Sequence, residues 1–337
     1  DFPLSLTAEA IYTKNINAVM QENYLIMNPE ASWAKFAGSD QRYIYPSVYR
    51  YEPSSVGVRD ANVLSNTDKG YGYTLNSEPL PRLNLMAAYT FTEMKEVSGM
   101  PGSNANSAWV GVLSVDGPNT AGIQRSQYVV PHKVIASASY RLPYANDHLA
   151  TTFSVFYSGY SPYGNSFTYS NDMNGDGLTG DLIYIPKERG DINFVSAEDE
   201  NAFFKFMEQD NYLKNHKGEY AEAYAARAPW VNKFDLRVMQ DFSLNVAGRK
   251  HTLQASVDIL NFGNMLNSEW GVNKNMASSN FGAILRYEGR DAGNVPEFSM
   301  IKINDSEGNS VYPSETYTPY LNLSQVWQVQ VGLRYLF

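Results

Sequence analysis

Six consecutive residues near the middle of the chain have the types and spacing of a calcium-binding loop. Residues 172 to 177 read Asp-Met-Asn-Gly-Asp-Gly, with oxygen-bearing side chains at the first, third and fifth positions and glycine at the sixth. An EF-hand-type loop begins in this way, because Ca²⁺ takes hard oxygen ligands and the glycine permits a sharp turn. Where such a loop closes with Glu, this chain has Ile183, and the nearest carboxylate belongs to Asp181.

The pattern predicts four candidate Ca²⁺ ligands, which are Asp172, Asn174, Asp176 and Asp181. An Asx-rich turn that binds no metal is the alternative interpretation.

Residue patterns for catalysis are weak. The four histidines are far apart and form no His-Glu-x-x-His zinc motif, and the chain has neither a Gly-x-Ser-x-Gly nucleophile elbow nor a Walker loop. Cysteine is absent, so a thiolate nucleophile or a disulfide framework is impossible. We therefore expect that the protein is not an enzyme. The histidines are His132, His148, His216 and His251.

The composition favours a β-strand protein in contact with lipid. A formal net charge of -9 argues against a general nucleic-acid binder, which needs a basic face. No run of about 18 apolar residues occurs, so the sequence predicts no transmembrane helix. A transmembrane β-barrel needs no such run, because lipid-facing residues alternate with polar ones. The 25 Tyr and 16 Phe suit its aromatic girdles.

Alternation of apolar and polar residues predicts eight strands. In the last one, every second residue from Val329 to Phe337 is apolar or aromatic, whereas Gln330 and Arg334 lie between them. Because side chains on a strand alternate between its two sides, this strand has one apolar and one polar face. The predicted strands lie within residues 4–12, 69–76, 82–94, 133–142, 149–157, 234–246, 251–260 and 325–337.

Very short and very long connections alternate between these strands. Loops beyond about 15 residues are uncommon in compact soluble domains, which makes a soluble β-sandwich the weaker alternative. Outer-membrane barrels have short periplasmic turns and long extracellular loops. The sequence therefore predicts an all-β, antiparallel transmembrane β-barrel of the outer membrane, of which this chain supplies about eight strands. Its long extracellular loops are predicted at residues 14–61, 96–127, 161–232 and 263–323.

The third long connection contains a predicted short helix and several aromatic residues. Ser196 and Asp199 have the spacing of a helix cap, and Phe203, Phe204 and Met207 form a short apolar stripe. We expect this stripe to pack on neighbouring loops, with a binding face as the alternative. An aromatic cluster nearby is also expected to pack, and two tryptophans are expected to anchor strands at the headgroup level. The cluster is Tyr160, Tyr163, Phe167 and Tyr169, and the tryptophans are Trp230 and Trp270.

Three stretches resemble a known family. NDMNGDGLTGDLIYIPK at 171–187, YAARAPWVNKFDLRVMQDF at 224–242 and LQASVDILNFGNMLNSEWG at 253–271 resemble the C-terminal barrel of Bacteroidetes TonB-dependent receptors. They are most similar to the Oar-like group, which carries a carboxypeptidase-regulatory-like domain. The terminal LRYLF resembles the signal by which such barrels are recognised for membrane insertion, with Tyr335 and Phe337 as its assembly residues.

The resemblance implies active uptake of a large or scarce substrate across the outer membrane of a Gram-negative cell. Family members have a barrel of roughly 22 strands filled by a plug, and this chain is similar to about their last third. Residues 1–337 would then be barrel wall, with outer-membrane lipid, the plug and the remaining strands as neighbours. The TonB complex would act through the plug, and a surface lipoprotein is a further expected partner.

Two alternatives stay open. Eight strands can also close into a small barrel by themselves. A barrel wall looks the same in a structural or docking scaffold of a surface or secretion complex as it does in a transporter.

Overall fold

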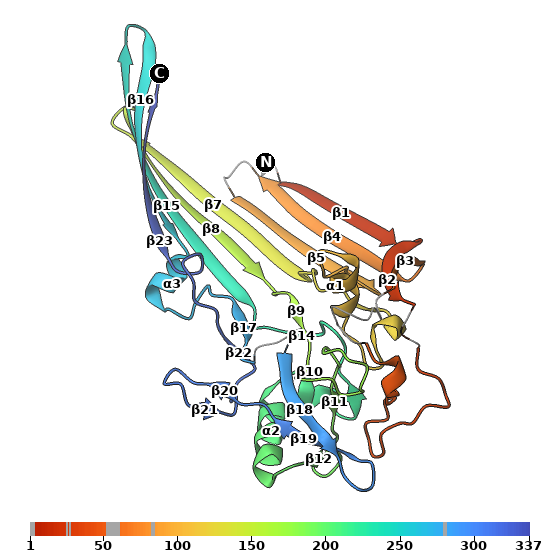
Figure 1. The fold of residues 1–337 in the computed structure, drawn as a ribbon. Helices are drawn as coiled ribbons and strands as arrows, with labels where there is room; N and C mark the ends of the chain where they lie inside the picture. Colours follow the sequence, from red (N-terminus) through yellow and green to blue (C-terminus); the bar gives the residue numbers. More distant parts are fainter. Residues whose placement is uncertain (1–3, 25, 27, 52–60, 82–84, 279–281) are drawn as a thin grey trace.

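The structure is a computed structural model that describes residues 4–24, 26, 28–51, 61–81, 85–278 and 282–337 (Figure 1). It consists of one long antiparallel sheet and, at one end of this sheet, a lobe formed by the connections between the strands. No helix in the described ranges is long and apolar enough to cross a membrane.

Eight long strands form the main sheet, and all eight lie where alternation predicts them. Neighbours in the order β1-β4-β5-β7-β8-β15-β16-β23 are antiparallel, and the short strand β6 (Gln124–Arg125) pairs with β5. The prediction of an all-β, antiparallel sheet is therefore confirmed. The strands are β1 (Leu4–Lys14), β4 (Gly70–Pro81), β5 (Leu85–Glu96), β7 (His132–Tyr144), β8 (Leu149–Tyr160), β15 (Val231–Val246), β16 (Arg249–Leu260) and β23 (Gln328–Leu336).

Tight turns join β7 to β8 and β15 to β16 at the end of the sheet away from the lobe. Ala247 and Gly248 connect β15 to β16 and have φ angles of 52° and 78°. A two-residue hairpin turn of this kind requires positive φ at both positions, which glycine adopts at no steric cost. Both ends of the chain also lie at this end (Figure 1).

The register gives the sheet one apolar and one polar face. Val238 pairs with Phe153 on one side and with Val257 on the other, and Val257 pairs with Val331. Paired residues lie on the same face, so these side chains form a row across four strands. They are exposed, and Val331 reaches 76% exposure. A continuous apolar face thus points away from the protein.

The opposite face of the same strands is polar and internally paired. Arg237 donates to Asp258 across β15 and β16, with 3.0 Å between Nη2 and Oδ2. Arg141 on β7 lies 3.3 Å from Asp241, and the Ser243 and Thr252 hydroxyls are 2.9 Å apart. The period of two that the terminal strand shows in sequence therefore holds across the sheet.

The sheet is open within the described residues. Strand β1 pairs only with β4, and β23 pairs only with β16, so one edge of each remains without a partner in this part of the chain. Closure into a barrel, whether by these strands or by further ones, stays a prediction.

The long connections fold together into the lobe. Measured between strands of the main sheet they are residues 15–69, 97–131, 161–230 and 261–327, and the first is longer than predicted because β2 and β3 form a separate two-stranded sheet within it. The elements of the first two are β2 (Ala18–Asn23), β3 (Asn62–Thr67), α1 (Ala105–Val110) and the 3-10 turns η1 (Ser47–Tyr49) and η2 (Pro118–Thr120).

The third and fourth connections supply most of the regular structure of the lobe. Strands β10, β18, β19 and β12 form its four-stranded sheet, in which β10 with β18 and β12 with β19 are parallel pairs. The elements are β9 (Gly164–Asn165), β10 (Thr168–Tyr169), β11 (Tyr184–Ile185), β12 (Asn193–Phe194), α2 (Ala197–Gln209), η3 (Leu213–Asn215), β13 (Glu219–Tyr220), β14 (Ala226–Arg227), α3 (Phe262–Leu266), β17 (Lys274–Met276), β18 (Ala283–Arg290), β19 (Pro296–Met300), β20 (Ile303–Asn304), β21 (Ser310–Val311) and β22 (Tyr317–Pro319).

The lobe has a hydrophobic core of its own, larger than the local packing of helix and aromatic residues that the sequence predicts. Phe36, Leu113, Phe203 and Phe298 are buried in one cluster, and each comes from a different long connection. Burying a side chain of this size stabilises the fold by about 1.5 to 3 kcal/mol. Stretches that look like polar loops in the sequence are therefore the parts of one packed body.

The predicted helix is confirmed as α2, and its apolar stripe is packed. The Ser196 hydroxyl accepts a hydrogen bond from the Asp199 N–H and caps the helix, while Phe203, Phe204 and Met207 are buried. In the aromatic cluster Phe167 and Tyr169 are buried as expected, whereas Tyr163 is 60% exposed. Trp230 and Trp270 are also exposed, and their role as membrane anchors stays a prediction.

Candidate functional site

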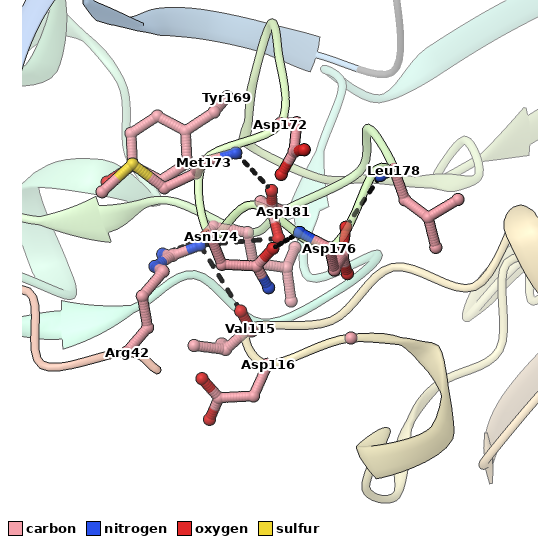
Figure 2. A network of polar contacts seen from close by, with 12 residues as sticks. Arg42, Val115, Asp116, Tyr169, Asp172, Met173, Asn174, Asp176, Leu178 and Asp181 are labelled. Carbon is pink, nitrogen blue, oxygen red and sulfur yellow. Dashed lines mark hydrogen bonds and ion pairs between the residues drawn. The ribbon is translucent and has the colours of Figure 1, made fainter. Parts of the chain in front are cut away.

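Residues 172–181 form a tight loop in the lobe, held by hydrogen bonds from backbone to carboxylate (Figure 2). Asp172 accepts from the Gly175 N–H through Oδ1 at 2.7 Å and from the Gly177 N–H through Oδ2 at 2.9 Å. Both glycines have positive φ, and a Cβ at Gly177 would lie 1.9 Å from the carbonyl oxygen of Tyr51. The glycines of the motif are thus required for the turn and for a close approach of two backbones.

The other residues of the motif also accept hydrogen bonds from nearby backbone N–H groups. Asp176 Oδ1 accepts from the Leu178 N–H at 2.8 Å, and Asn174 Oδ1 accepts from the Asp176 N–H at 2.9 Å. Asp181 reaches back across the loop and accepts from the Met173 N–H at 2.8 Å. The structure therefore brings the four predicted residues into one loop, and at least one side-chain oxygen of each accepts a hydrogen bond from a nearby backbone N–H.

A buried arginine locks this loop to the first long connection. Arg42 is fully buried, and its Nε lies 3.0 Å from Asp40 Oδ1 while Nη1 lies 3.7 Å from Asp181 Oδ1. Its Nη2 donates to the Leu182 carbonyl at 2.6 Å, and Figure 2 shows Nη1 between Asp181 and the Val115 carbonyl. Burial alone lowers the pKa of Arg42, but Asp40, Tyr169 and Asp181 together outweigh it and raise that pKa. The guanidinium therefore stays charged.

The carboxylates of Asp176 and Asp181 are buried, and burial disfavours their charged form. Burial, together with the negative charge of Asp172, raises the pKa of Asp176 to about 7. Burial and the charge of Asp176 also raise the pKa of Asp181, although Arg42 opposes this shift. Such a group of acids is stabilised by a bound proton or by a nearby cation.

Among the described residues, no group of three or more His, Cys, Asp or Glu side chains is arranged to hold a metal ion. Asp172, Asn174, Asp176 and Asp181 are close in sequence and in space, but at least one oxygen of each already accepts from a backbone N–H. Calcium binding stays a prediction.

The predicted assembly residues lie at the turn end of the outward face. Tyr335 and Phe337 are exposed, and their rings stack with 5.9 Å between centroids. The Tyr335 hydroxyl lies 2.7 Å from His251 Nδ1 on the neighbouring strand. Their role in membrane insertion stays a prediction.

A cavity at the junction of sheet and lobe has no counterpart among the predicted sites. It has a volume of about 610 Å³ and lies against the polar face of the sheet where β7 and β8 meet the lobe. A second cavity of about 660 Å³ adjoins it, and the two share Lys133 and Val130. The residues that line the first cavity include Lys133, Tyr160, Tyr163, Asn273, Lys274 and Tyr320.

No sequence motif could have revealed this cavity. Its walls come from the ends of two strands and from β17 and the segment before β23, which are more than a hundred residues apart in the chain. The local hint in the sequence is Tyr163, an aromatic residue that was expected to pack and that the structure leaves exposed.

Comparison with known proteins found no matching family model, no matching curated protein and no matching solved structure.

Proposed function

We propose that this chain is part of the wall of an outer-membrane β-barrel that acts as a TonB-dependent uptake receptor. The observation that carries the proposal is the two-faced sheet: eight antiparallel strands with an exposed apolar face and a polar, ion-paired opposite face. In a transmembrane barrel the side chains of each strand alternate in this way between the lipid and the lumen.

The outward face needs a nonpolar solvent. Leu333 and Val331 on β23 are 74% and 76% exposed, and Phe337 is 85% exposed. A soluble monomer rarely leaves more than a few hundred Å² of contiguous apolar surface in water. Lipid acyl chains are an environment in which this face carries no such cost.

The open edges support a wall that continues beyond these strands. Backbone N–H and C=O groups along β1 and β23 would each cost several kcal/mol if left unpaired in lipid. We propose that further strands pair with both edges and close the barrel, as the family resemblance implies.

The position of the lobe fits the receptor role. It covers one end of the sheet, and both cavities lie between it and the polar face. A ligand that reaches the lobe from outside the cell would meet these cavities before the lumen. In the proposed mechanism TonB acts through a plug domain, so no residue of this chain is assigned to energy coupling.

Membrane placement can be tested directly, because the chain has no native cysteine. Single cysteines at Val331 and Gln330 would place a nitroxide label on opposite faces of β23. In native membranes we expect the Val331→Cys label to be accessible to oxygen and the Gln330→Cys label to be accessible to a water-soluble nickel complex. Equal accessibility of both labels to the nickel complex would refute the proposal that these strands form part of a membrane-spanning barrel wall.

Binding to TonB distinguishes the receptor role from the scaffold alternative. We expect the whole protein, extracted in detergent, to be retained on the immobilised periplasmic domain of TonB, with a general porin as the negative control. Retention no greater than that of the porin would favour a structural or docking scaffold, to which the lobe would offer a surface for a lipoprotein.

A further inference from the structure

We propose that the 610 Å³ cavity between sheet and lobe binds a carboxylate-bearing oligosaccharide, an inference that rests on the proposed uptake function and names its ligand class. The volume falls in the range of small-molecule sites, which is about 300 to 1,000 Å³.

The charge of the cavity selects an anion. Lys133 and Lys274 line it, and none of the described residues in its wall is acidic. Neither lysine belongs to an ion pair within the described part of the chain. The adjoining cavity is lined by Lys69 and Lys133 against one acid, Glu96. In a protein with a formal charge of -9, this is a local reversal of sign.

The uncharged lining selects a ligand with many hydroxyl groups. Tyr163 and Tyr320 are 60% and 49% exposed, and their rings offer flat apolar faces with a hydroxyl at the end. Four amide side chains complete the wall, and each amide carries donors and an acceptor side by side, as hydroxyl groups require. The amides are Asn165, Asn273, Asn275 and Gln325.

Part of this lining is held in place before any ligand arrives. The Tyr160 hydroxyl donates to Asn273 Oδ1 at 2.8 Å. The Asn273 N–H and Lys233 Nζ donate to Gln325 Oε1 at 3.3 Å and 3.4 Å. These bonds use the amide oxygens, so the NH₂ groups of Asn273 and Gln325 remain as donors. Fixed donors lower the entropy lost on binding.

The same lining disfavours other anions. Among the described residues that line it, Val130 and Pro162 are the only aliphatic ones, so its apolar surface consists largely of tyrosine rings, which suit the flat faces of sugars better than the branched side chains of a peptide. It contains no arginine among the described residues, although arginine is the usual bidentate partner of phosphate groups. Lysine as a point charge, with amides and tyrosines, fits carboxylates on a sugar chain better.

The test is isothermal titration of the whole protein, extracted in detergent from the membranes of the cells that produce it. The probes are trigalacturonate, neutral maltotriose and triglutamate. We expect binding of trigalacturonate, with affinity at least tenfold above that of the other two. Lys133→Gln and Lys274→Gln should each weaken it about tenfold, because each removes a charge-assisted hydrogen bond. Lys274→Arg should retain most of the affinity.

Lys250→Gln is the matched control, because Lys250 is exposed near the turn at the other end of the sheet. This variant should bind as the parent protein does. The proposal is overturned by equal binding of maltotriose, by tighter binding of triglutamate, by lysine variants with unchanged affinity, or by no binding of trigalacturonate. Failure here is distinct from failure of the uptake function, since spin-label accessibility and TonB retention are measured without a ligand.

Discussion

At the residue scale, Arg42 is the side chain on which the candidate loop depends. It is buried between Asp40, Asp181 and two backbone carbonyls, and the hydroxyls of Tyr169 and Tyr220 donate to the same Asp40 at 3.1 Å and 2.9 Å. A buried charge with this many partners is costly to remove, because its partners are left uncompensated.

We therefore expect Arg42→Leu to destabilise the lobe by about 3 to 5 kcal/mol, which is typical of a broken buried ion pair. The midpoint of thermal unfolding, followed by tryptophan fluorescence, checks this. The control is Arg286→Leu, since Arg286 is half exposed and 3.4 Å from Glu288, and such a pair contributes at most about 1 kcal/mol. Equal effects of the two variants would mean that Arg42 is not a structural centre.

The calcium prediction also belongs to this scale. We expect added Ca²⁺ to raise the melting temperature of the protein and to give a binding heat that disappears in the double variant Asp172→Ala with Asp176→Ala. The control is Asp305→Ala, because Asp305 accepts backbone N–H bonds from Glu307 and Asn309 outside the motif. If the parent protein shows no binding heat with Ca²⁺, the calcium prediction is wrong and the loop is an Asx-rich turn that binds no metal.

At the element scale, the turn between β15 and β16 places an alanine in a backbone conformation that favours glycine. Ala247 has a φ of 52°, where a residue with a Cβ is strained by roughly 1 to 2 kcal/mol. The neighbouring Gly248 has no such strain at 78°.

Ala247→Gly should therefore stabilise the hairpin by about 0.5 to 1 kcal/mol, after allowance for the greater entropy of glycine in the unfolded chain. Ala255→Gly in the middle of β16 is the opposite control and should destabilise it by a similar amount. The temperature at which the folded band is lost on a denaturing gel measures both. A lower temperature for Ala247→Gly would contradict the turn geometry.

At the scale of the whole molecule, the main sheet has one apolar and one polar face, and the lobe covers one end of it. The apolar face runs across all four strands from β8 to β23, while the polar face carries the pairs Arg141–Asp241 and Arg237–Asp258. Because a strand alternates its side chains, neighbouring residues of one strand should respond to the same substitution in opposite ways.

Two arginine substitutions on β16 make this quantitative. Val257→Arg points outward and should cost about 2 to 4 kcal/mol in a bilayer, whereas Gln254→Arg on the polar face, where Gln254 already donates to Asp241 at 2.9 Å, should be tolerated. The yield of heat-modifiable protein in membranes reports the difference. Tolerance of both would argue that this face does not contact lipid.

The main sheet could be predicted from local patterns of residues. Alternation over Val329 to Phe337, and over the other seven segments, has the period of a strand, and short Gly, Asn and Asp turns fix which strands pair. Helix α2 was equally readable, because a cap at Ser196 and an apolar stripe are local signals. These features depend on residues that are close together in the chain.

The lobe and its sites, in contrast, depend on contacts between distant parts of the chain. Phe36, Leu113, Phe203 and Phe298 share one core although they come from four connections, and Arg42 meets Asp181 across 139 positions of chain, the difference between the two residue numbers. The cavity at Lys133 and Lys274 likewise joins distant segments. Contacts of this kind join residues that are far apart in the chain, and no pattern within one segment indicates which other segment it will meet.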